Sequence, residues 1–172
     1  LAALATRGHA IDLVSPYDAD EVDPHEVTRQ LAPWCHAHLV AARPRSLPRA
    51  GLRSLAGRMP LSIARHDHPA VRHCVAELLH EEWLPGGRGE AVHAEQLKAL
   101  PACTPAFASG VAVVLRCQNV ESALWQGYAR RTHGVPSLLA ALEARRLARW
   151  EARALRRATA VLALTAEDAV RL

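Results

Sequence analysis

Residues 111–131 read VAVVLRCQNVESALWQGYARR, and this stretch decides the fold. The run from Val111 to Arg116 is rich in β-branched residues. Such a run is typical of a strand that is buried on both faces, as in a parallel sheet. Polar residues follow at once, and the segment from Asn119 to Arg131 has the composition of a helix. A buried strand that leads through a short polar turn into a helix is the repeating unit of an α/β protein.

The same alternation of strand and helix runs through the rest of the chain. The patterns predict strands at 9–14, 37–42, 90–95, 111–116 and 159–164, with a loop at 85–89. They predict helices at 1–7, 24–31, 47–58, from 67 onward, 96–100, 119–131, 136–157 and from 165 onward. Strands separated by helices in this way predict one α/β domain with a Rossmann-like, doubly wound parallel sheet.

Several predicted helix ends carry residues that suit them. Gly8 follows the first helix, where a residue with positive φ is favoured. Asp23-Pro24 is a good N-cap followed by proline at the first helical position. Thr165 precedes the last helix, and Asp168 three residues later completes an approximate capping box.

Composition and charge narrow the class of protein. The chain has 172 residues and a net charge of +4, and no window is long and apolar enough for a membrane span. Its four cysteines form no C-x-x-C pair, which favours free thiols in a cytoplasmic protein. Acidic residues crowd between Asp12 and Glu26, whereas the stretch 27–63 contains none. Such asymmetry can mark an anionic partner.

Ligands of a doubly wound sheet bind beyond the carboxyl ends of its strands. This rule selects polar residues that follow four predicted strands, Gln96 and Thr165 among them, and these are able to hold sugar hydroxyls or phosphate oxygens. His93, inside the strand at 90–95, is a separate candidate for the cleft. The alternative for Asn119 is a simple helix cap, and the alternative for His93 is a core histidine. The candidate binding residues are Ser15, His93, Glu95, Gln118, Asn119 and Glu121.

The stretch VVLRCQNVESALWQGYA, residues 113–129, resembles the H-N-V-E-S-x-L-W segment of bacterial family 4 glycosyltransferases, which have the GT-B fold. Three further stretches resemble parts of the same enzymes in the same order. These are LAALATRGHAIDLVSP (residues 1–16), AVHAEQLKAL (91–100) and EARRLARWEARALRRATAVLALTAEDAVRL (143–172). Residues 43–89 match least.

This resemblance implies that residues 1–172 are a partial N-terminal, acceptor-side domain. It implies a retaining, metal-independent transfer from a nucleotide-sugar donor to a carbohydrate or lipid-linked acceptor, with no cofactor besides that co-substrate. It also implies that the first strand and the C-terminal, donor-binding domain lie outside this sequence. Without that strand, the strands at 9–14 and 90–95 lose a shared neighbour, so we expect the isolated chain to be poorly stable or to aggregate.

Gln118 departs from the family pattern, because members usually carry histidine at this position. An amide donates and accepts hydrogen bonds but does not become cationic or act as a general acid or base. Either the protein works with an uncharged group there, or its activity is altered or lost. The sequence assigns no catalytic acid or base.

The arginine-rich stretch 43–58 has a possible role of its own, because some relatives contact membranes through basic, partly apolar helices. Leucines alternate with arginines along the predicted helix, as in an interfacial helix, although an ordinary surface helix has the same pattern. The sequence favours the ordinary surface helix, and peripheral contact with the inner face of a membrane is the alternative. The arginines concerned are Arg45, Arg49, Arg53 and Arg58.

Two other classes of protein compete with the glycosyltransferase. A nucleotide-dependent oxidoreductase is disfavoured because no G-x-G-x-x-G occurs in the sequence. A non-catalytic module would use arginines at helical spacing, from Arg145 to Arg156, to bind nucleic acid or an anionic membrane. The leading interpretation involves no nucleic acid. It also involves no metal, since neither Cys35-His36-Ala37-His38 nor His66-Asp67-His68 has zinc-site spacing.

Overall fold

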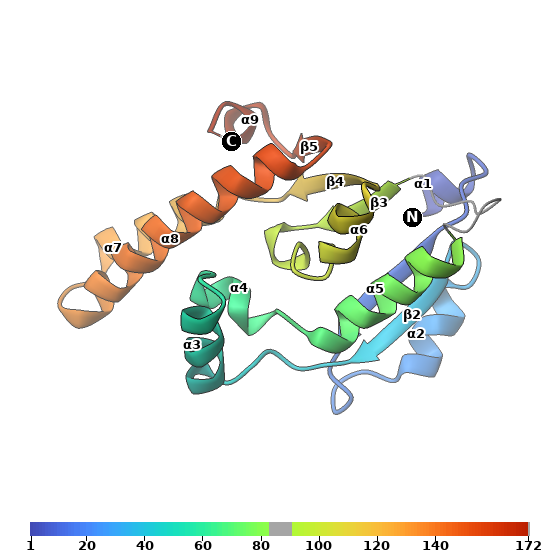
Figure 1. Ribbon diagram of the computed structural model, residues 1–172, viewed down its shortest axis with the longest axis horizontal. Coiled ribbons are helices and arrows are strands. Elements are labelled where there is room, and N and C mark those ends of the chain that lie inside the picture. The colour runs from blue at the N-terminus through green and yellow to red at the C-terminus, as the bar shows by residue number, and fades with distance from the viewer. Residues whose placement is uncertain (83–90, 172) are drawn as a thin grey trace.

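The computed structural model describes residues 1–82 and 91–171, and it is an α/β protein with parallel strands (Figure 1). The strands are β1 (Asp12–Tyr17), β2 (His36–Ala41), β3 (Ala91–Glu95), β4 (Ala112–Cys117) and β5 (Ala160–Ala163). The helices are α1 (Ala2–Ala5), α2 (Pro24–Leu31), α3 (Leu47–Ala56), α4 (Leu61–Arg65), α5 (Pro69–Glu82), the 3-10 turn η1 (Leu97–Ala99), α6 (Thr104–Ser109), α7 (Glu121–Arg131), α8 (Val135–Arg157) and α9 (Ala166–Arg171).

The strands form two small parallel sheets instead of one. β1 pairs with β2, and β3, β4 and β5 form a second sheet in that order. Within the described residues, β1 and β3 are therefore each paired along one edge only. Figure 1 shows β2 and β4 both pointing toward the side of the molecule on which α3 and α4 lie. The expected α/β class with parallel strands is confirmed, whereas a complete doubly wound sheet is not seen.

Helix ends behave as the sequence predicts. Gly8 has φ of 84°, and the amide of His9 donates to the Leu4 carbonyl at 3.3 Å, which closes α1. The Asp23 side chain accepts a hydrogen bond of 2.9 Å from the amide of His25 and caps α2. Thr165 Oγ1 accepts from the amide of Asp168 at 3.0 Å, so the predicted cap of α9 is confirmed.

β1 differs from its prediction. The strand was expected at 9–14 and to end at Ser15-Pro16, but it spans Asp12–Tyr17 and includes both residues. Proline has no amide hydrogen, and a strand tolerates it where that side makes no ladder bond. β1 meets this condition because β2 is its only partner among the described strands. Ser15 therefore lies inside a strand and not beyond its end.

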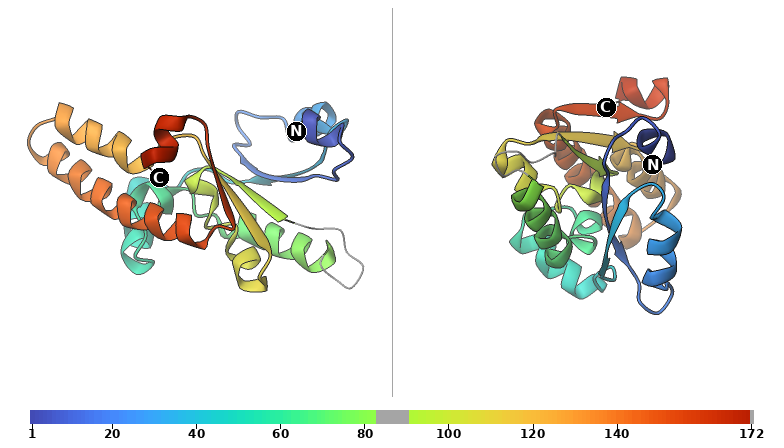
Figure 2. Two further views of the ribbon diagram at one scale, coloured as in Figure 1. Left: turned by 90° about the horizontal axis from the view of Figure 1, so that it is seen from above. Right: turned by 90° about the vertical axis from the view of Figure 1, so that its right-hand side faces the viewer.

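β4 alternates between buried and half-buried residues, which corrects the expectation of burial on both faces. Val113 and Leu115 have no exposed surface, whereas Val114 and Arg116 are half-buried. The buried face joins one hydrophobic core with residues of α4, α5, α6 and α8, among them Ile63, Leu79, Ala106 and Leu147. The opposite face of β3 and β4 stays partly open to solvent. Helices thus cover this sheet mainly from one side, as Figure 2 shows from two directions.

The β1–β2 unit contributes little to this core. Among residues 1–49, Cys35 alone is buried, and no residue before Met59 belongs to the core cluster. α5 contacts both β1 and β2 and also α6, so it connects this unit to the larger sheet. The first sheet is consequently the less buried half of the molecule.

α8 is tied to two other helices by buried carboxylates. Glu143 is 5% exposed and accepts from the amides of Leu61 and Ser62 at 3.0 and 2.8 Å, at the start of α4. Glu151 is also 5% exposed and accepts from the amides of Glu121 and Ser122 at 2.6 and 3.1 Å, at the start of α7. A carboxylate at a helix N-terminus satisfies free amides and the local positive dipole.

Two short helices, α4 and α6, were not expected from the sequence. α6 begins at Thr104-Pro105 and ends at Ser109, and Gly110 with φ of 73° closes it. Both are shorter than the window in which helical periodicity is legible. The loop expected at 85–89 lies outside the described residues, as does Glu90 of the expected strand 90–95.

Replacing Glu143 should destabilise the protein, because two amides at the start of α4 would lose their acceptor. We expect Glu143→Ala to lower the free energy of unfolding by about 2 kcal/mol or more, measured by urea denaturation. Glu143→Gln keeps one acceptor and should lose less. Glu77→Ala on the exposed face of α5 is the matched control, expected within about 0.5 kcal/mol of the parent. A loss for Glu143→Ala as small as that of the control would contradict this role.

All four cysteines are free thiols, as predicted, and burial sets their reactivity. Burial raises the pKa of Cys103 to about 11, whereas Cys74 is the only thiol that is not fully buried. In a native titration with Ellman's reagent we expect Cys74 to react first and Cys103 only as fast as the protein unfolds. Mass spectrometry of partly modified protein locates each label, and early labelling of Cys103 would contradict its burial.

Candidate functional site

A network of polar side chains lies at the carboxyl ends of β3 and β4. Glu95 is its centre, because one carboxylate oxygen accepts from Arg116 Nη1 at 2.7 Å and from Gln118 Nε2 at 2.9 Å. Gln118 Oε1 in turn accepts from Gln96 Nε2 at 2.9 Å. His93 Nε2 lies 3.6 Å from the other oxygen of Glu95. Three of the predicted residues, His93, Glu95 and Gln118, are therefore brought together.

Strand register and alternation produce this grouping. Glu95 lies opposite Arg116 in the parallel pair β3–β4. Side chains two residues apart point to the same face of a strand, so His93 lies beside Glu95, and Gln118 continues the row of Arg116. The side chains of His93 and Glu95 are 45% and 46% exposed, so this face of the sheet is accessible to a ligand.

Gln96 holds an unusual backbone conformation next to this network. Its φ is 74° and its ψ is 157°, a region that residues other than glycine rarely occupy. Its amide still donates to the Arg116 carbonyl at 2.9 Å, so the ladder to β4 continues one residue past the strand. The turn places the Gln96 amide group against Gln118. The sequence predicts Gln96 as a polar residue after the strand at 90–95, but a positive φ in a glutamine has no sequence signature.

Glu121 and Asn119 occupy the turn that links β4 to α7. The Glu121 side chain is only 13% exposed, and its carboxylate lies 3.9 Å from Lys98 Nζ of η1. Asn119 is exposed within the bend before the helix. The amide donors at the start of α7 point to Glu151, so the anion site that a helix N-terminus offers is filled by a side chain of α8.

Burial raises the pKa of Glu151 above its ordinary value. Hydrogen bonds from Ser122 and Glu121 act in the opposite direction because they favour the charged form. The nearby carboxylate of Glu121 adds a smaller upward effect.

A second polar cluster surrounds Asp67, which is 1% exposed. Arg53 Nε donates to its carboxylate at 2.6 Å, Arg72 forms a second ion pair with it, and Arg45 Nη2 donates to its backbone carbonyl at 2.6 Å. From the sequence, Asp67 is expected to start a helix, and the set His66-Asp67-His68 lacks the spacing of a zinc site. One feature of the sequence could have indicated this cluster: Asp67 is the first acidic residue after the stretch 27–63, which contains arginines and no acid.

The four arginines that are candidates for membrane contact separate into two pairs. Arg45 and Arg53 bind Asp67, whereas Arg49 and Arg58 are exposed. Next to this cluster, burial and then nearby cationic side chains, Lys98 first among them, lower the pKa of His66. Burial followed by Arg45 lowers the pKa of His68.

Ser15 is not part of the network. It pairs in register with Leu39 of β2, in the other sheet, and its hydroxyl donates to the carbonyl of Pro16 at 3.3 Å. No hydrogen bond among the described residues joins β1 to the residues at the ends of β3 and β4.

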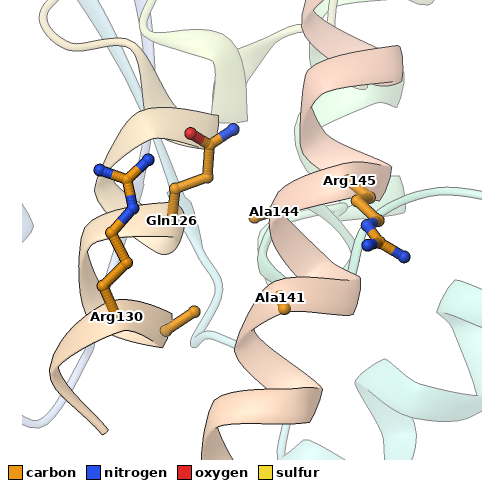
Figure 3. Close-up of a pocket in the computed structure, with 6 residues that line it drawn as sticks. Gln126, Arg130, Ala141, Ala144 and Arg145 are labelled. Atoms are coloured by element: carbon orange, nitrogen blue, oxygen red, sulfur yellow. The ribbon is translucent and has the colours of Figure 1, made fainter.

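A shallow hollow of about 290 Å³ lies elsewhere, between α7 and α8 (Figure 3). Gln126 and Arg130 rise from α7 on one side, while Ala141 and Ala144 form the wall on α8. None of its lining residues belongs to the polar network. The polar network, with its hydrogen-bond donors and acceptors, is therefore the candidate functional site, and the hollow is separate from it.

Within residues 1–82 and 91–171, no three histidine, cysteine, aspartate or glutamate side chains gather as a metal ion requires. Among the described helices, none combines the length and the apolar character needed to cross a bilayer. Comparison with protein-family models, curated proteins and solved structures finds no match for this chain.

The network suits the binding of a neutral polar molecule. Glu95 is an acceptor already oriented by Arg116, and the amide groups of Gln96 and Gln118 supply both donors and acceptors. Such a mixture matches the hydroxyl groups of a sugar. Lys98, which lies beside Glu121, adds a positive charge nearby.

The raised pKa of Glu151 predicts a pH effect on stability. A carboxyl group whose pKa is higher in the folded state contributes least to the free energy of unfolding when it is fully ionised. The stability of the parent relative to Glu151→Gln should therefore fall as the pH rises above 4.5, the ordinary pKa, and level off past the raised one. Urea denaturation at pH values up to about 8 measures this difference. Glu167→Gln, which removes an exposed carboxylate of α9, controls for the loss of charge, and a difference that rises with pH would contradict the assignment.

Proposed function

We propose that this chain is the acceptor-side part of a glycosyltransferase that moves a sugar from a nucleotide-sugar to a carbohydrate or lipid-linked acceptor. The observation that carries the proposal is the hydrogen-bonded group Glu95, Gln96 and Gln118 at the carboxyl ends of adjacent parallel strands. Ligands of open α/β sheets bind at such ends. The resemblance of residues 113–129 to family 4 enzymes names the reaction.

We infer that further polypeptide completes a doubly wound sheet. β2 and β1, followed by β3, β4 and β5, have the order found on the two sides of the central strand of such a sheet. Among the described strands, β1 and β3 each have one unpaired edge, and this and the sparse burial of the β1–β2 unit support a missing strand between them. On this proposal the nucleotide is held by a second domain outside the 172 residues.

The roles of the site residues follow from their chemistry. Glu95 accepts hydrogen bonds from acceptor hydroxyls, and Gln118 orients Glu95 while it offers its own amide. Arg116 holds the Glu95 carboxylate in place, because its Nη1 donates a hydrogen bond to one carboxylate oxygen at 2.7 Å. Gln118 is a binding residue and not a proton carrier, so proton transfer falls to another group.

Sugar transfer by the full-length protein tests this function, with a panel of UDP- and GDP-linked hexoses as donors. Transfer or donor hydrolysis supports it, whereas oxidation or reduction with NAD(P) and no sugar transfer would establish the competing oxidoreductase class. Glu95→Ala should lower kcat/KM roughly tenfold to hundredfold, since it removes charge-assisted hydrogen bonds. Gln118→Ala should cost about two- to tenfold.

Glu77→Ala is the matched control, because Glu77 is an exposed carboxylate of α5 with no contact to the network. It should leave kcat/KM unchanged. If Glu95→Ala transfers sugar with the same kcat/KM as the parent, Glu95 does not bind the acceptor.

A further inference from the structure

The helical hairpin of α7 and α8 exposes an unusual number of large apolar side chains. Figures 1 and 2 show it projecting from one end of the molecule. On α8, Val135, Leu138, Leu139 and Leu142 are between 55% and 72% exposed. These four residues follow the spacing i, i+3, i+4, i+7 and share one face of the helix. We call them the apolar tip.

The same face of α8 becomes basic farther from the tip. Leu138 and Leu142 are followed at helical spacing by Arg145, Arg149, Arg153 and Arg156, all of which are exposed. We call these four arginines the basic row. The apolar tip spans about 10 Å along the helix axis, and the basic row begins immediately beyond it.

The acids of the hairpin do not neutralise this row. Glu143 and Glu151 are buried and bound to helix amides, and the Glu121 side chain is 13% exposed. The hairpin therefore presents arginines as its exposed charges. The acidic segment at α2 lies toward the opposite end of the molecule (Figure 1).

The side chains of the two arginines at the end of α7, Arg130 and Arg131, point away from the apolar tip. Side chains lean toward the N-terminus of their helix, so those of α7 lean away from the tip and those of α8 lean toward it. Figure 3 shows the Arg130 guanidinium beside Gln126, one turn back from the end of α7. Arg131 folds back in the same way, because a Cβ placed on Gly127 would lie 3.4 Å from its Nη1.

We propose that the α7–α8 hairpin binds an anionic lipid bilayer, with the apolar tip inserted at the headgroup boundary and the basic row at the phosphates. Interfacial helices lie in the plane of the membrane and bury their apolar face about 5–10 Å deep, and α8 carries the apolar tip and the basic row on one face. Pairing with a second copy along this face would bring two basic rows together. A nucleic acid would match the row but leave the apolar tip exposed. The proposal does not depend on sugar transfer.

Vesicle sedimentation of the full-length protein tests the proposal, with a sample without vesicles as the control for aggregation. We expect binding to phosphatidylcholine vesicles that contain about a third phosphatidylglycerol, weak binding without it, and weakening by salt. Arg145→Gln/Arg149→Gln should lower the partition coefficient about 25-fold, since each arginine near an anionic surface contributes about fivefold. Leu138→Ser/Leu142→Ser should lower it at least about tenfold.

Leu52→Ser/Leu55→Ser on α3 is the matched control, because these leucines are 72% and 75% exposed and belong to the other candidate membrane helix. It should bind vesicles like the parent. Leu139→Trp should show a blue-shifted emission relative to the parent and quenching by brominated acyl chains. All substituted side chains are exposed, so circular dichroism should stay unchanged.

Three results would overturn the proposal. One is absent binding or equal binding to both kinds of vesicle. Another is loss of binding in the α3 variant while the hairpin variants bind normally. The third is a dimer in sedimentation velocity that Leu138→Ser/Leu142→Ser dissociates, because the face would then be covered by a second copy.

Discussion

The arrangement of this protein depends on two carboxylates of one helix that bind the amide ends of two others. Glu143 holds the start of α4, and Glu151 holds the start of α7. Burying a carboxylate is costly unless hydrogen bonds compensate it, and a helix N-terminus supplies them. Because α7 follows β4 directly, Glu151 also fixes the turn in which Asn119 and Glu121 lie. The position of the candidate site therefore depends on a residue about thirty positions away in sequence, although Glu151 has no place in the binding chemistry.

Hydrophobic periodicity and helix-capping residues were enough to predict the order of strands and helices from the sequence. The strands at β3, β4 and β5 and the long helix α8 were placed within a few residues, because each combines a clear pattern with Gly, Pro or Thr at its ends. The end of β1 was misplaced because Pro16 is acceptable in a strand whose outer edge is free. Whether strands join one sheet or two is decided by neighbours far along the chain, and no local pattern contains that information.

The candidate site was predictable in part for a similar reason. The rule of carboxyl ends located Glu95, Gln96 and Gln118, since it needs only strand order, and His93 was a separate candidate inside its strand. Ser15 lies outside the network, because β1 continues to Tyr17 and does not end at residue 14 as predicted. The strained backbone of Gln96 and the ion pairs of Asp67 were not predicted, since both arise from tertiary contacts. The arginines of the stretch 43–58 look alike in sequence, yet Asp67 binds Arg45 and Arg53 and leaves Arg49 and Arg58 in solvent.

The alternation along β4 has an evolutionary consequence. Val113, Leu115 and Cys117 belong to the core, where a change in volume is felt throughout the fold. Val114, Arg116 and Gln118 face the open side, where new side chains displace solvent instead of neighbours. Substitutions at every second position of β4 can therefore change which ligand the open face binds without disturbing the packing of the core. Gln118 lies on this open side, so a different residue there would change the polar network and leave the core packing in place.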